Sequence, residues 1–143
     1  MEDDTIKLLR ECDSGIQMGI ASIDEVLNYV ENESFKKLLT DCRTESEHLK
    51  DEIEAELSQY HEDKKGPNPV AKGMSWMKTN VMLIMKQSDR TIADLMTEGC
   101  NMGVKSLHKY LNQYRAASQK AKDLAKQLAR SEEKLAIDIR PFL

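Results

Sequence analysis

The sequence predicts an all-α fold: an internally duplicated four-helix bundle with an additional crossover helix. Three observations predict it. Apolar residues recur at helical spacing, the 143 residues contain only 3 Pro and 6 Gly, and the second half of the chain resembles the first. A chain of this length can bury a core without disulfides or metals. We therefore expect one domain over residues 1–143, built from a hairpin (1–62), a linker and crossover helix (63–88) and a second hairpin (89–143).

Helical spacing is clearest in the first hairpin. Between about Asp4 and Val30, apolar residues are three or four positions apart, at Ile16, Ile20, Ile23 and Leu27. A second helix, which Asn32 or Ser34 would cap, continues this spacing to about His61. Its apolar stripe runs through Phe35, Leu39, Cys42, Leu49 and Ile53. The short connection predicts antiparallel neighbours.

The linker is marked by Gly66, Pro67 and Pro69, which interrupt a helix. After it, residues 70–87 recover the helical period and predict the crossover helix. Its apolar residues lie on more than one face: Met74, Trp76, Met77, Met82 and Met85. Such a helix must bury its second apolar face against another surface. We therefore predict a homodimer through the crossover helix, with packing against the bundle as the alternative.

An internal repeat predicts the second hairpin. The string "GIQMGIASIDEVLN" from Gly15 matches "GCNMGVKSLHKYLN" from Gly99, 84 residues later, and "DDTIKLL" matches "DRTIADL" at a displacement of 86. The repeat predicts helices over about 90–114 and 117–140. A chain reversal at Gly99 and Gly103 is the alternative, since glycine commonly ends helices. The match to glycines inside a periodic helix favours a continuous helix, and we expect these glycines to allow close helix approach.

Two antiparallel helix pairs joined by one long crossover form the ferritin-like arrangement. Over nearly its whole length the chain resembles bacterial ferritin-like domains of unknown function, whose "DG…G" and "GE" strings are similar to "DSGIQMG" and "EGCNMG" here. The resemblance implies a bundle that could hold iron or manganese between inward-facing carboxylates and Glu-His pairs. Cys100 departs from it, because those domains carry glutamate after the glycine.

The candidate metal ligands are Asp24, Glu45, His48 and His108. Glu45 and His48 have the three-residue spacing of a di-iron site. The second half lacks that pair, and Lys109 stands in the region matching the acids of the first helix, where a cation opposes metal binding. We therefore expect no cofactor and a non-catalytic scaffold or interaction protein. The alternatives are an oxidoreductase or metal-storage protein with a reduced iron or manganese site, and a bundle that binds a small apolar ligand.

Polar residues interrupt the apolar stripes at Asp13, Ser46, Glu56, Ser118 and Glu132. Burying a carboxylate is unfavourable unless it is paired. These residues therefore either belong to a satisfied polar layer or bundle end, or mark a pocket.

Composition and charge limit the classes of partner that we expect. A net charge of −4 argues against nucleic acid, and the chain has no apolar run of the roughly 20 residues that span a membrane. The acidic N-terminus does not resemble a secretory signal, so we expect a cytoplasmic protein. Cys12, Cys42 and Cys100 are expected to be reduced thiols packed in the core.

Overall fold

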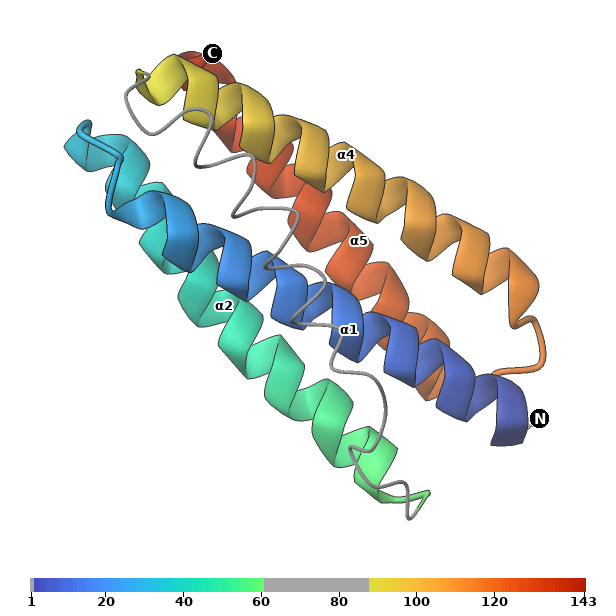
Figure 1. The fold of residues 1–143 in the computed structure, drawn as a ribbon. Coiled ribbons are helices and arrows are strands. Elements are labelled where there is room, and N and C mark those ends of the chain that lie inside the picture. The colour runs from blue at the N-terminus through green and yellow to red at the C-terminus, as the bar shows by residue number, and fades with distance from the viewer. Residues whose placement is uncertain (1, 61–87) are drawn as a thin grey trace.

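The computed structural model describes residues 2–60 and 88–143, and this part of the chain is all-helical. Its elements are α1 (Glu2–Leu27), α2 (Glu33–Ser58), α4 (Asp89–Gln113), α5 (Gln119–Ile139) and the short 3-10 helix η1 (Arg140–Phe142) (Figure 1). The all-α bundle is thus confirmed. The crossover helix predicted over 70–87 and the dimer predicted through it lie outside the described residues.

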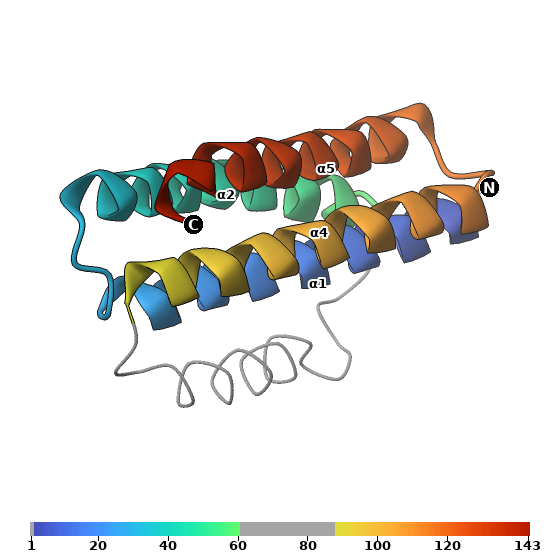
Figure 2. The ribbon, with the colours of Figure 1, turned by 90° about the horizontal axis from the view of Figure 1, so that it is seen from above.

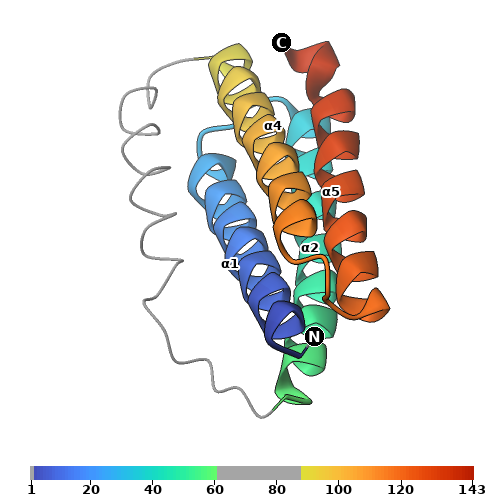
Figure 3. The same ribbon diagram turned by 90° about the vertical axis from the view of Figure 1, so that its right-hand side faces the viewer.

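The four helices form two antiparallel hairpins arranged in two layers. Contacts are most extensive within the pairs α1–α2 and α4–α5, and α1 also packs against both α4 and α5. Figures 2 and 3 show α1 and α4 in one layer and α2 and α5 in the other. The helices α1 and α5 run in one direction, and α2 and α4 run in the opposite one (Figure 1). None of the described helices combines the length and the apolar stretch needed to cross a bilayer.

Helix α4 runs without interruption through Gly99 and Gly103, which confirms the continuous helix that the repeat predicted. The expected role of the glycines was wrong. A Cβ atom added at Gly15, Gly19 or Gly99 would have no neighbour within 4 Å among the described residues. Within residues 2–60 and 88–143, these glycines therefore do not bring the backbones of α1 and α4 into contact.

The buried stripes follow the predicted spacing with two local shifts. Val26 is buried where Leu27 was expected, and Leu57 is buried where Glu56 was expected. A strict four-three pattern has 3.5 residues per turn, whereas a straight helix has 3.6, so the buried stripe drifts along a long helix.

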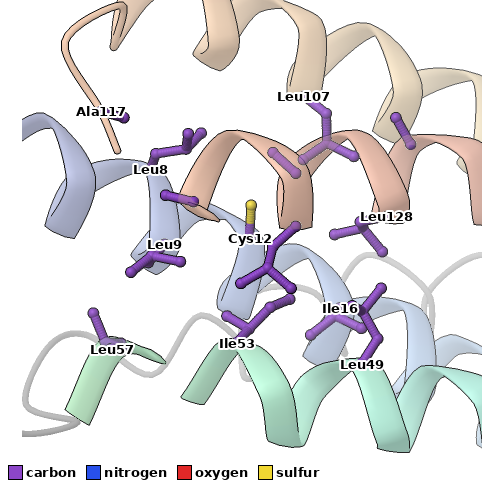
Figure 4. Close-up of a cluster of buried hydrophobic side chains, with 14 of the residues drawn as sticks. Leu8, Leu9, Cys12, Ile16, Leu49, Ile53, Leu57, Leu107, Ala117 and Leu128 are labelled. Carbon is purple, nitrogen blue, oxygen red and sulfur yellow. The ribbon is translucent and has the colours of Figure 1, made fainter. Parts of the chain in front are cut away.

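Two clusters of buried side chains form the core. The first packs Leu8, Leu9 and Cys12 of α1 against Ile53 of α2 and Leu124 of α5; Figure 4 shows its α1 and α2 side chains meeting between the helices. The second is built around Val26, Phe35, Leu39, Ile92 and Ile139, and the ring of Phe35 stacks on that of Phe142. Burying one large apolar side chain contributes about 1.5–3 kcal/mol, so these clusters supply most of the driving force for folding.

Both α2 and α5 begin with a side-chain cap. The Asn32 side chain accepts a hydrogen bond from the Phe35 amide at 3.0 Å, and the Ser118 hydroxyl accepts one from the Ala121 amide at 3.1 Å. Each cap satisfies a helix-terminal N–H that has no partner within the helix. The two caps lie at matching positions, 86 residues apart.

The first turn of α4 holds the connection between α1 and α2. The Asp89 carboxylate accepts hydrogen bonds from the Glu31 amide at 2.9 Å and the Asn32 amide at 2.8 Å. At the opposite end of the bundle, the first turn of α1 holds the α4–α5 connection, because the Ala116 amide donates to Asp4 at 3.0 Å. The buried hydroxyl of Thr5 accepts from the Ser118 amide there at 2.7 Å.

We predict that Asp89→Ala lowers the free energy of unfolding by about 1–2 kcal/mol, since two amides lose a charged acceptor. Urea denaturation followed by circular dichroism measures the change. The control is Arg90→Ala, which alters the exposed neighbouring residue and should stay within about 0.5 kcal/mol of wild type. Equal effects of the two substitutions would contradict the role of Asp89.

Candidate functional site

A cavity of about 440 Å³ lies between α1 and α4, with residues of α2 and α5 lining its inner side. Ile16, Leu107 and Leu128 from the first core cluster line it, as do Met96 and Leu135 from the second. The cavity therefore separates the two clusters in the middle of the bundle. Its volume falls in the range of small-molecule sites, about 300–1,000 Å³.

The mouth of the cavity is built from matching residues of α1 and α4. One glycine, methionine, glycine and serine come from each helix: Gly15, Met18, Gly19 and Ser22 on α1, and Gly99, Met102, Gly103 and Ser106 on α4. Met18 is 37% exposed and Met102 is 57% exposed, so this side of the cavity reaches the surface. The glycines leave room that larger side chains would fill. The repeated small residues were the sequence signal for this cavity, although they suggested close helix packing.

Two polar residues of the apolar stripes, Ser46 on α2 and Glu132 on α5, line the cavity. They lie 86 residues apart, at matching positions of the two hairpins. For these two, the pocket interpretation is correct.

Ser118 and Glu56 fit the alternative of a bundle end, and Asp13 makes a hydrogen bond within α1. Ser118 caps α5, Asp13 accepts a hydrogen bond from the Gln17 side chain at 2.8 Å, and Glu56 lies near the end of α2, where the Gln59 side chain donates to it at 3.4 Å.

Glu132 is the main electrostatic feature of the site. Its Oε2 atom is buried and has no hydrogen-bond partner within residues 2–60 and 88–143. Burial raises the pKa of this carboxyl group to about 8, because a charged carboxylate loses its hydration there. At neutral pH the side chain is therefore largely protonated and can donate a hydrogen bond.

Gly103 makes room for this carboxyl group. A Cβ atom at Gly103 would lie 2.7 Å from Cδ of Glu132, closer than real Cβ contacts. The Glu132 side chain thus extends from α5 to the backbone of α4, across the inner side of the cavity. Any larger residue at position 103 would displace the carboxyl group.

A second acidic residue lies at the part of the cavity near the first core cluster. Glu11 on α1 and Tyr110 on α4 both line the cavity there. Burial, followed by the hydrogen bond to Glu11, raises the pKa of the Tyr110 hydroxyl. Tyr110 therefore remains protonated at neutral pH and joins α4 to α1 through this hydrogen bond.

The cysteines are free thiols, as predicted, with Cys12 and Cys100 buried and Cys42 half-buried. Burial raises the pKa of Cys12 and of Cys100 to about 12, and it also raises the pKa of Cys42. Cys42 and Cys100 line the cavity. Because the thiolate is the nucleophilic form, these groups are poor nucleophiles at neutral pH.

The structure does not bring the predicted metal ligands together. Asp24 on α1 pairs with Arg43 of α2, while Glu45 and His48 on α2 and His108 on α4 are exposed. Within the described part of the chain, no group of three or more His, Cys, Asp or Glu residues is placed to hold a metal ion. Glu45 and His48 have the right spacing but lie outside the buried stripe of α2.

The inward positions offer few metal donors. On each of α2 and α5, two inward-facing positions lie three residues apart. They are Ser46 and Leu49 on α2, and Glu132 and Leu135 on α5. A ferritin-like di-iron site takes Glu and His at such pairs. With one carboxylate among the four positions, this donor set does not fit a di-iron centre.

Comparison with known proteins assigns no family. No family model, no curated protein and no solved structure matches the chain.

We predict that the free energy of unfolding of Glu132→Gln, relative to that of wild type, increases as the pH rises. The folded pKa of about 8 lies above the ordinary value of 4.5, so the folded state binds the proton more tightly, and the wild type loses stability between these two pH values. A glutamine cannot ionise and escapes this loss. The advantage of the variant should grow by roughly 2 kcal/mol or more from pH 5 to pH 8.

Urea denaturation at the two pH values, with a reducing agent present, measures this difference. The control is Glu133→Gln, which removes an exposed carboxylate from the same helix and should show little such trend. Parallel pH profiles for wild type and Glu132→Gln would show that the carboxyl group titrates normally.

We predict opposite responses to alanine at two cavity glycines. Gly99→Ala should stabilise the protein by about 1 kcal/mol, since alanine favours the helix and the new methyl group enters open space. Gly103→Ala should lose this gain because its Cβ displaces the Glu132 carboxyl group. Adding Glu132→Ala should restore the gain, which a double-mutant cycle measures. Equal stabilisation by both single substitutions would contradict the contact.

Proposed function

We propose that this protein is a small-molecule-binding helical bundle whose ligand occupies the cavity between α1 and α4. The observation that carries the proposal is a cavity of about 440 Å³ with a buried, hydrogen-bond-deficient carboxyl group on its inner side. Ligand sites in proteins are typically apolar concavities with a few placed polar groups. This cavity fits that description.

The residues that line the cavity would contribute to binding in two ways: the apolar side chains by burying the ligand, and Glu132 by orienting it. Apolar side chains such as Ile16, Met96 and Leu135 would bury the body of a ligand. Each Å² of apolar surface removed from water contributes roughly 25 cal/mol. Glu132 would fix the orientation through a hydrogen bond, because its buried oxygen lacks a partner in the described structure.

Stability alone does not account for this arrangement. A core cavity removes packing contacts, and an unpartnered buried carboxyl group loses about 1–3 kcal/mol of hydration without compensation. Leucine or methionine at position 132 would fill the space. Departures from good packing and polar satisfaction are typical of functional sites.

In this proposal the bundle is an internally duplicated, ferritin-like fold. Four features support it: the opposed directions of the hairpins, the matching caps at Asn32 and Ser118, the reciprocal contacts at the two bundle ends, and the matching residues of the cavity mouth. A ferritin-like metalloprotein places metal ligands at inward positions of the bundle. Here small or apolar residues (glycine, serine and leucine) would occupy such positions. The space left by those smaller or apolar residues would accept an organic molecule.

We predict that the uncharged dye N-phenyl-1-naphthylamine binds with saturable fluorescence at one site per chain. Gly99→Leu should weaken binding by about tenfold or more, because the leucine side chain enters the cavity while the helix tolerates it. Fluorescence titration measures the affinity, and thermal denaturation confirms that the variant folds.

The matched control is Lys109→Leu, which adds the same side chain at an exposed position of α4 outside the cavity. It should bind the dye like wild type. Equal affinity in Gly99→Leu and wild type would place the dye elsewhere, and absence of saturable binding to wild type would count against the proposed function.

A further inference from the structure

Among the described residues that line the cavity, the ionisable carboxyl groups have no basic counterpart. Glu11 and Glu132 line it, and no lysine, arginine or histidine is among the described lining residues. In this partly desolvated space the carboxylate of Glu11, and that of Glu132 once it loses its proton, attract a cation and repel an anion, since electrostatic interactions strengthen as water is excluded.

The polar groups of the cavity also offer hydrogen-bond acceptors. The buried Oε2 of Glu132 lacks a partner in the described structure. The Ser22 hydroxyl, which also lines the cavity, already donates its proton to the Met18 carbonyl at 2.8 Å, so it can act towards a ligand only as an acceptor. An ammonium group has three N–H donors and no acceptor, which complements these oxygens.

We propose that the ligand is an apolar molecule with a single amine, whose ammonium group donates to the carboxylate of Glu132. This inference rests on the proposed function and specifies its ligand class. A fatty acid or another apolar anion could accept a hydrogen bond from protonated Glu132, but none of the described lining residues is a base that would neutralise its charge. A neutral alcohol could accept a hydrogen bond from protonated Glu132 but would gain no ionic interaction.

The groups facing Glu132 support this choice. Three thiols interact with it electrostatically, Cys12 on α1, Cys42 on α2 and Cys100 on α4, and Glu11 lines the same cavity. None of them can neutralise a carboxylate. On the same helix, Lys134 is 72% exposed in its side chain and pairs with Asp138 at 3.7 Å; its charge acts on the Cys42 thiol but does not contribute to the pKa shift of Glu132. The ligand would therefore supply the missing positive charge.

Charge pairing gives binding a characteristic pH dependence. Without a ligand the carboxyl group holds its proton up to about pH 8, so an ammonium ligand must displace that proton. Binding then releases a proton near neutral pH, and the affinity rises with pH as the carboxylate forms. A neutral acceptor ligand would show the opposite trend, because it needs the protonated form.

The test uses three probes with the same carbon chain: n-octylamine, 1-octanol and octanoate. Each displaces the naphthylamine dye from wild-type protein at pH 6 and pH 8. We expect octylamine to bind at least about tenfold more tightly than octanoate, and its affinity to rise about tenfold from pH 6 to pH 8. Calorimetry in two buffers of different ionisation enthalpy should show proton release.

Two isosteric variants locate the interaction. Glu132→Gln should weaken octylamine by about tenfold and abolish its pH dependence, while 1-octanol changes by less than about threefold. Glu133→Gln, in which an exposed acid is neutralised, should behave like wild type.

The outcomes separate the two proposals. Tighter binding of octanol or octanoate than of octylamine, or an octylamine affinity that is insensitive to Glu132→Gln, would overturn the amine proposal and leave the binding function standing. Failure of the dye and all three probes to bind would overturn both.

Discussion

The carboxyl group of Glu132 reaches from α5 to the backbone of α4, and the space it needs shapes the middle of the bundle. Gly103 must lack a side chain at this point of contact. The same carboxyl group lies between the two core clusters, so the apolar packing is interrupted there. Its raised pKa follows from this position, because burial removes the water that would stabilise the charged form.

The two ends of the bundle make this interruption tolerable. Asp89 holds the α1–α2 connection, and Asp4 with Thr5 holds the α4–α5 connection, so each hairpin is fixed by the first turn of the other. Dense clusters near both ends supply the apolar burial. The middle of α1 and α4 can therefore stay apart without loss of the overall arrangement.

The four described helices could be predicted because helical periodicity is a local property of the sequence. The repeat also correctly extended α4 through Gly99 and Gly103. The role of these glycines could not be predicted in the same way, because small residues permit either close packing or open space, and the distance between helices decides which. The spacing of Glu45 and His48 suggested metal ligands, but their position relative to the buried stripe places them at the surface. Ser46 and Glu132 were detectable because both interrupt an apolar stripe.

At neutral pH, the protonation states of Cys100 and Glu132 make these two groups a weak nucleophile and a weak base. Cys100 has a pKa of about 12, so almost none of it is thiolate at neutral pH, and the largely protonated Glu132 is a weak general base. Burial produces both effects, and the same burial strengthens an ionic contact with a ligand that excludes water. A ligand with an ammonium group would reverse the unfavourable burial of the carboxylate. The group that weakens the empty protein is therefore the one that would hold and select its ligand.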